Sequence, residues 1–159
     1  MGYNEVGIEN QAVFDDLKNR IKREIGTAKQ NSDLVIVSFH WGIEYTTQPK
    51  PRQKELAHLA IDSGADLIVG NHPHWIQPVE VYKDKLIVYS HGNFVFDQMW
   101  SQKTREGMVG KYYFYNNKLI DAEFFPVIIE DYGQPRFAMD TQKEKILKRF
   151  KEESLKLNN

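Results

Sequence analysis

The chain has 159 residues, 41% hydrophobic and 27% charged, so we expect residues 1–159 to form a single domain around one core. The formal net charge of −1 argues against nucleic acid as a partner, and the absence of cysteine excludes disulfides and thiolate metal sites. We also expect neither a secretory signal in the first twenty residues nor a membrane span, which needs roughly 18 consecutive apolar residues.

Two helices and two buried strands are expected in the first half. From Asn10, a typical N-cap residue, apolar residues recur every three or four positions to Ile25, which predicts an amphipathic helix as the only element before the first strand. Residues 33–39 predict a strand buried on both faces, residues 51–64 a second helix, and residues 65–69 a second buried strand. This order predicts a right-handed parallel strand pair.

Histidines follow both of these strands. His40 comes directly after the first strand, and His72 and His74 lie just beyond the second, with Pro73 stiffening the loop between them. Because parallel strands end at the same edge of a sheet, where ligands collect in open α/β sheets, the three histidines should lie close together. Imidazole is a common neutral metal ligand, so this arrangement predicts a metal site. The alternative is a plain loop whose histidines hydrogen-bond to backbone carbonyls.

Alternating apolar residues predict antiparallel hairpins in the second half. One hairpin covers residues 77–90 and the other covers residues 111–129, with its turn at Asn116 and Asn117. The tail predicts a terminal helix over residues 140–157, with Thr141 and Glu144 as a capping box. Several aromatic residues near the expected loop edge are interpreted as core packing rather than as a ligand platform: Trp41, Tyr45, Trp75, Phe94, Phe96 and Trp100.

Three separated motifs, in this order, resemble the C-terminal half of the CapA-type family of bacterial poly-γ-glutamate capsule synthesis proteins. They are VIVSFHWGIEY (35–45), QKELAHLAIDSGADLIVGNHPHWIQPVEVY (53–82) and LIVYSHGNFVFDQ (86–98). That family is similar to the calcineurin-like metallophosphoesterases. The resemblance implies an α/β fold, a partial metallophosphoesterase-like sandwich. Its parts would be a short parallel strand-helix-strand unit, then antiparallel hairpins, with flanking helices.

The resemblance also implies roles for the three histidines. His40 matches the family's strand-end metal histidine, and His72 and His74 match its Gly-x-His-x-His ligand pair. The implied cofactor is a divalent metal ion: manganese, zinc or iron.

Three further residues are expected near the same cleft. Glu44 matches a position of the family motif, without a metal role that we can assign. Asn93 matches the end of the family's YSLGNF motif and is expected to border the cleft. His91 stands where the family usually has leucine, and it is either an added ligand or proton donor, or a partly buried polar residue.

Other ligands of the family's dinuclear centre should come from its first half, as an aspartate after a strand and an Asn-His pair. Neither precedes His40, so we expect the chain to be the C-terminal portion of a larger domain. Two divalent cations about 3.5–4 Å apart repel by on the order of 15–20 kcal/mol at an effective dielectric constant of about 20, which neutral imidazoles do not offset. We therefore expect at most one weakly held ion per chain, released as histidines protonate near a pH of about 6.5.

The resemblance implies a metallophosphatase-related protein that is associated with capsular poly-γ-glutamate synthesis or export. Such a protein would be a hydrolase located at the cell envelope or outside the cytoplasm, although we expect this chain alone to be inactive. The alternative is a non-catalytic module that binds a partner or polymer within a cell-envelope synthase complex. Membrane-bound capsule synthase components are the expected partners, and unpaired sheet edges leave a homo-oligomer open.

Overall fold

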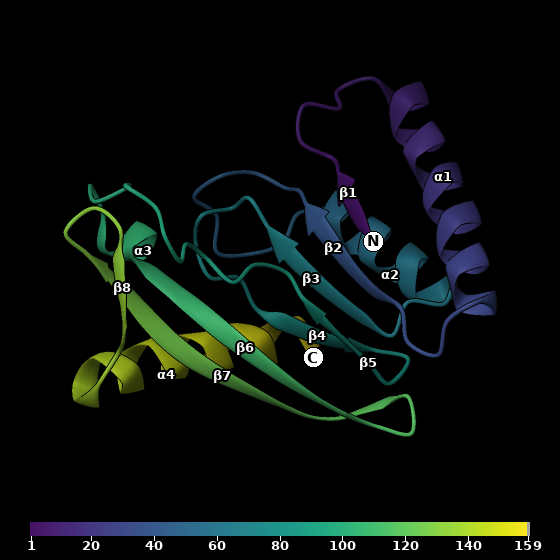
Figure 1. Cartoon of the computed structure of the whole chain (residues 1–159). Coiled ribbons are helices and arrows are strands. Elements are labelled where there is room, and N and C mark those ends of the chain that lie inside the picture. Colours follow the sequence, from purple (N-terminus) through teal and green to yellow (C-terminus); the bar gives the residue numbers. More distant parts are fainter. Residues whose placement is uncertain (159) are drawn as a thin grey trace.

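The structure is a computed structural model that describes residues 1–158. Two β-sheets and four helices make up its fold. A five-stranded sheet has the order β1-β2-β3-β5-β4, and a three-stranded antiparallel sheet has the order β6-β7-β8. The elements are β1 (Gly2–Asn4), α1 (Gln11–Gln30), β2 (Ile36–His40), α2 (Pro51–Asp62), β3 (Leu67–Asn71), β4 (Val79–Tyr82), β5 (Lys85–Val88), α3 (Gln102–Arg105), β6 (Glu106–Tyr115), β7 (Lys118–Glu130), β8 (Gln134–Phe137) and α4 (Asp140–Asn158). The β6–β7 hairpin and α4 lie on the side of the larger sheet away from α1 (Figure 1). The expected α/β class, a partial sandwich, is confirmed.

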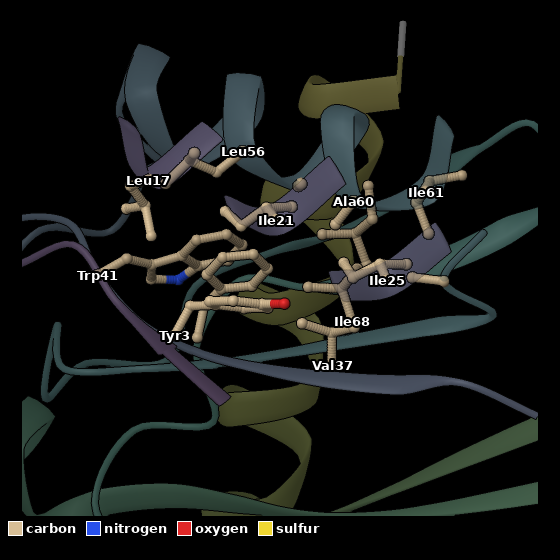
Figure 2. Packing of buried hydrophobic residues seen from close by; sticks show 14 of the residues in the cluster. Tyr3, Leu17, Ile21, Ile25, Val37, Trp41, Leu56, Ala60, Ile61 and Ile68 are labelled. Atoms are coloured by element: carbon tan, nitrogen blue, oxygen red, sulfur yellow. The ribbon is translucent and has the colours of Figure 1, made fainter. Parts of the chain in front are cut away.

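Helices α1 and α2 cover one face of the larger sheet. The Asn10 side chain accepts hydrogen bonds from the backbone N–H groups of Ala12 and Val13, so it caps α1 as predicted. The buried residues of α1 form one stripe, and they meet α2 and the sheet in the main core (Figure 2). Apolar burial along this stripe, rather than helix propensity, holds α1 in place.

Parallel pairing of β2 with β3 places both strand ends at one edge. The register pairs Phe39 with Gly70 and His40 with Asn71, which confirms the predicted strand-helix-strand unit. The prediction that the first strand is buried on both faces was wrong. Burial alternates along β2, and Ile36 remains 40% exposed, because helices cover only one face of the sheet at this strand.

The N-terminal residues form a strand that the sequence did not predict. β1 pairs in parallel with β2, with Tyr3 opposite Phe39, and the two rings pack with centroids 5.6 Å apart. A strand of only three residues is too short to produce a visible alternation, so the expectation of a helix alone before His40 was wrong.

Both predicted hairpins are present. Lys83 and Asp84 form the turn between β4 and β5, and Asn116 and Asn117 form the turn between β6 and β7. All four residues have positive φ, which is the twist that two-residue hairpin turns require. The short elements α3 and β8 were not predicted.

Helix α4 spans the predicted terminal segment and protects a sheet edge. The capping-box prediction was wrong, because the helix begins at Asp140 and Thr141 lies inside its first turn. Near the other end, Ser154 and Asn158 accept hydrogen bonds from the backbone N–H groups of Val79 and Val81, at 3.1 and 2.9 Å. These contacts satisfy the open edge of β4, which would otherwise invite pairing with another chain. No helix within residues 1–158 combines the length and the apolar character needed to cross a membrane.

A buried carboxylate joins three elements next to the parallel pair. Asp66 accepts a hydrogen bond from the backbone N–H of Val35 at 2.9 Å and forms ion pairs with Lys29 and Lys85, both at 2.7 Å. Burial acts to raise the pKa of the Asp66 carboxyl, but the hydrogen bonds from the two lysines and Val35 outweigh it and hold the pKa below its usual range. Asp66 therefore ties α1 and β5 to the start of β3.

Replacement of Asp66 by alanine should lower the free energy of unfolding by about 2–4 kcal/mol at neutral pH, because the Val35 N–H and two ammonium groups lose a buried partner. The native pKa is depressed, so this stabilisation is complete above a pH of about 4 and is lost as the pH falls through the native pKa. Urea unfolding of the wild type and of Asp66→Ala at neutral and acid pH measures this contribution to stability. The matched control is Asp62→Ala, which removes an exposed pair with Lys83 and should change stability by less than about 1 kcal/mol. Equal losses in the two variants would contradict this role for Asp66.

Candidate metal site

The three predicted histidines gather at one edge of the larger sheet. His40 ends β2, while His72 and His74 lie in the loop after β3. The ring centroids of His40 and His72 are 4.6 Å apart, and those of His72 and His74 are 5.9 Å apart. The parallel pairing of β2 and β3 produces this convergence, as expected from the sequence.

A carboxylate joins two of these histidines. Glu44, His72 and His74 each offer one ligand atom, and these atoms all lie within 4.8 Å of one another. His40 stands outside this group of three, although its ring adjoins that of His72. We refer to Glu44, His72 and His74 as the ligand triad. Two imidazoles and one carboxylate form a donor set that zinc uses in open catalytic sites.

Sequence reasoning placed Glu44 near the cleft but gave it no metal role. Its Oε1 lies 3.8 Å from His74 Nε2, and its side chain is 45% exposed. The available signal was a carboxylate four residues beyond a strand-end histidine. That spacing alone cannot show that the loop folds back over the turn after β3. The backbone N–H of Tyr45 donates to the Pro73 carbonyl at 2.8 Å and makes this connection.

The backbone at the site adopts a conformation that side chains other than glycine rarely take. Tyr45, His72 and His74 have φ angles of 59°, 97° and 59°, all in the left-handed region. Such residues cost of order 1–3 kcal/mol each and persist only where the surrounding structure imposes them. Strain gathered at the triad is typical of functional sites rather than of plain loop exits.

The electrostatic environment keeps His72 in the form that binds metals. Burial lowers the pKa of the His72 imidazole, the neighbouring His40 lowers it further, and only the Glu44 carboxylate clearly opposes this. A lowered pKa means that the ring is neutral at neutral pH, with a lone pair for a cation. Burial and then the Glu44 charge raise the pKa of the neighbouring Tyr45 phenol.

The other two cleft candidates differ in position. Asn93 is buried and its Oδ1 lies 2.8 Å from Nδ1 of His74, so it borders the triad directly. His91 points elsewhere, with Nε2 2.7 Å from the hydroxyl of Tyr112. Burial lowers the pKa of the His91 imidazole, and a hydrogen bond with the Gly70 backbone opposes this only in part. Among the described residues His91 is not grouped with the triad, and its environment is that of a partly buried polar residue.

Aromatic residues flank the triad on the side of the loop after β5. Trp41 is fully buried, as predicted, and stacks on Phe39. The core interpretation was wrong for Phe94 and Trp100, which are 52% and 62% exposed, because the loop after β5 leaves both outside the two core clusters. Phe96, also partly exposed, lies with its ring centroid 4.9 Å from that of His74.

Comparison with known proteins identifies the family of the chain. The sequence model of the family described as bacterial capsule synthesis protein PGA_cap matches residues 2–98, more than half of the chain. The chain belongs to this family. Its resemblance to CapA-type proteins is thereby confirmed, and the matched region contains the triad, His40 and Asn93.

Two curated relatives of the chain carry the name CapA. It is 43% identical over 122 residues to the capsule biosynthesis protein CapA of Bacillus anthracis and 42% identical over 123 residues to the PGA biosynthesis protein CapA of Bacillus subtilis. Each alignment covers 77% of this chain but only 29% and 32% of the respective relative. A probable polyglutamine synthesis accessory protein of Mycobacterium tuberculosis is 33% identical over 52% of this chain and 22% of its own length. The chain thus spans about a third of the CapA proteins that it matches.

Replacement of His91 by leucine should reduce the loss of stability on mild acidification. The pKa of His91 is lower in the folded chain than in the unfolded chain, where it is about 6.5. Between these two values the unfolded chain binds more protons at His91 than the folded chain does. The free energy of unfolding therefore falls as the pH is lowered through this range. Leucine removes this contribution. Urea unfolding at pH values of about 5 and 7.5 should show a smaller difference in the variant, with His72 supplying part of the remainder. An unchanged difference would contradict the buried, neutral state of His91.

Proposed function

We propose that Glu44, His72 and His74 bind one divalent metal ion, with His40 as an additional ligand. The observation that carries the proposal is the gathering of three ligand atoms from two separate loops within 4.8 Å. Imidazole suits zinc and iron, and a carboxylate suits manganese, so the donor set fits each of the three metals expected from the sequence. A structural site is closed by four protein ligands. The triad supplies three, and with His40 as the fourth ligand a substrate oxygen would bind by expansion of the metal to five-coordination, as occurs in catalytic zinc sites.

Charge limits the occupancy to one ion. Glu44 supplies a single negative charge, which offsets only part of the charge of one divalent cation. A second cation about 3.5–4 Å away would add repulsion on the order of 15–20 kcal/mol at an effective dielectric constant of about 20. Nothing in the triad compensates for that, because both histidines are neutral when they act as ligands.

The chemistry that fits this site is metal-assisted hydrolysis of a phosphoester-like bond. A bound ion would act as a Lewis acid toward an oxygen of the substrate. The chain's own residues would orient the reaction. The triad would hold the ion, and the rings of Tyr45, which stacks on His74, and Phe96, which packs against it at an angle, would exclude water from one side. With one ion in place of two, hydrolysis by this chain alone is expected to be slow.

In the cell, we propose a role in capsular poly-γ-glutamate synthesis or export, at the envelope, together with membrane-bound synthase components. The support is membership of the PGA_cap family and the names of the CapA relatives. One observation favours a second candidate, a non-catalytic module that binds a partner or the polymer. Phe94, Val95 and Trp100, in the loop after β5, are each more than half exposed, and exposed apolar and aromatic groups are typical of binding surfaces.

Metal content after dialysis against zinc or manganese tests the site. The wild-type chain should retain up to one ion per chain at neutral pH and release it as the pH falls below about 6.5, because protonated imidazoles are not ligands. Glu44→Ala, His72→Ala and His74→Ala should each lose most of the bound metal. The control is His58→Ala, since His58 pairs with Glu80 on another part of the sheet and should leave uptake unchanged.

Equal uptake by the wild type and the three triad variants would refute the metal site. Two tightly held ions per monomer would refute the charge argument. The two candidate functions separate in a second step, in which a chain with His40, His72 and His74 all replaced by alanine is tested for binding to capsule polymer and to synthase components. A purely binding role predicts that this binding survives, and a metal-dependent role predicts that the function in capsule synthesis is lost.

A further inference from the structure

A buried amide lies behind one of the three triad side chains. Asn93 is only 6% exposed, and all of its side-chain polar atoms have partners. Its Oδ1 lies 2.8 Å from Nδ1 of His74, and its Nδ2 lies 2.9 Å from the backbone carbonyl oxygen of Thr104 and 3.3 Å from Oε1 of Gln98. The chemistry of these partners therefore determines which end of the amide, the oxygen or the NH₂ group, points toward His74.

The Thr104 carbonyl decides that orientation. A backbone carbonyl oxygen can only accept a hydrogen bond, so the NH₂ group of Asn93 must face Thr104. The oxygen of the same amide must then face His74, where it can only accept. A neutral imidazole carries one proton, so that proton must sit on Nδ1 of His74, and Nε2 is left with its lone pair.

The free nitrogen faces the rest of the triad. His74 Nε2 lies 3.8 Å from Oε1 of Glu44, which is too far for a hydrogen bond. Without Asn93, the Glu44 carboxylate would favour the opposite form, with the proton on Nε2 and directed at the carboxylate. Asn93 and Glu44 thus compete over the position of one proton, and the hydrogen bond at 2.8 Å favours Asn93.

We propose that Asn93 is a positioning residue that selects the Nδ1-protonated form of His74 and thereby presents Nε2 as a metal ligand. The inference rests on the metal site proposed above and assigns Asn93 a definite role in it. Outer hydrogen-bond partners of this kind fix the orientation of a metal-ligating histidine and the position of its proton.

The surrounding loop holds Asn93 in place from both sides. Thr104 is fully buried, and its hydroxyl donates to the backbone carbonyl of Gln98 at 2.7 Å, which closes the loop behind the amide. Nε2 of Gln98 donates to the hydroxyl of Tyr45 at 3.0 Å, and the Tyr45 ring stacks near His74 with centroids 5.8 Å apart. The network begins and ends at His74, so neither the ring nor the amide can turn without breaking several contacts.

Long-range ¹H–¹⁵N spectra of the metal-free protein report directly which nitrogen of His74 carries the proton. The measurement is made at a pH of about 8.5, well above the usual imidazole pKa of about 6.5, so that the ring is neutral. The wild type should show protonated Nδ1. Asn93→Leu removes the acceptor and should shift the proton toward Nε2, whereas Asn93→Asp retains an acceptor and should keep Nδ1 protonated.

Gln102→Leu is the matched control, because it removes a nearby hydrogen bond, from Nε2 of Gln102 to Oε1 of Glu106 at 2.8 Å, that does not involve Asn93 or its partners. It should leave the His74 proton on Nδ1. Zinc affinity should fall about 10–100-fold in Asn93→Leu and much less in Asn93→Asp. The proposal is overturned if wild-type His74 is protonated on Nε2, if Asn93→Leu leaves the spectrum unchanged, or if Gln102→Leu shifts the proton as Asn93→Leu does.

Failure of the metal site can be told apart from failure of this proposal. If the wild type takes up no zinc while its spectra show the expected form, the proposed metal function is refuted. The selection of the His74 proton by Asn93 is still supported in that case, because it is read in the metal-free protein.

Discussion

The parallel pairing of β2 with β3 is the constraint on which the candidate site depends. It ends both strands at the same level, with His40 opposite Asn71, so the turns that follow must meet. Packing around the end of β3 leaves no room for a side chain at Gly70. A Cβ there would collide with the carbonyl oxygen of Tyr89 and with the indole of Trp41, whose Nε1–H donates to that carbonyl at 2.9 Å. Close packing at the end of β3 therefore fixes where the histidine loop begins.

The backbone of the loop that follows β3 adopts conformations that residues other than glycine rarely take. His72 and His74 are held at positive φ, and the fold must supply contacts that outweigh this strain. It does so from outside the turn: Tyr45 bonds to the Pro73 carbonyl, and Asn93 bonds to His74. A rigid sheet positions the turns, and a buried hydrogen-bond network behind them orients the side chains, which is the arrangement that a precise metal site requires.

Periodic features could be predicted from the sequence, whereas loop features could not. The stripe of α1, the parallel pair and the convergence of the histidines follow from patterns with a fixed period and a fixed handedness. The grouping of Glu44 with His72 and His74 was missed because it depends on a loop conformation set by tertiary contacts. The exposure of Phe94 and Trp100 was missed because a long loop has no periodic pattern that predicts whether an aromatic residue faces the core or the solvent. The strand at Gly2–Asn4 was too short to have a period.

The central claim is that two turns deliver imidazole and carboxylate groups to one ion. X-ray absorption at the zinc edge of the zinc-loaded chain tests this most directly, because it reports the atoms bound to the metal. The account predicts at least two imidazole nitrogens at about 2.0–2.1 Å together with oxygen from a carboxylate, and one imidazole fewer around the zinc that His72→Ala still retains. A zinc ion surrounded by oxygen alone, or an unchanged spectrum in that variant, would contradict it.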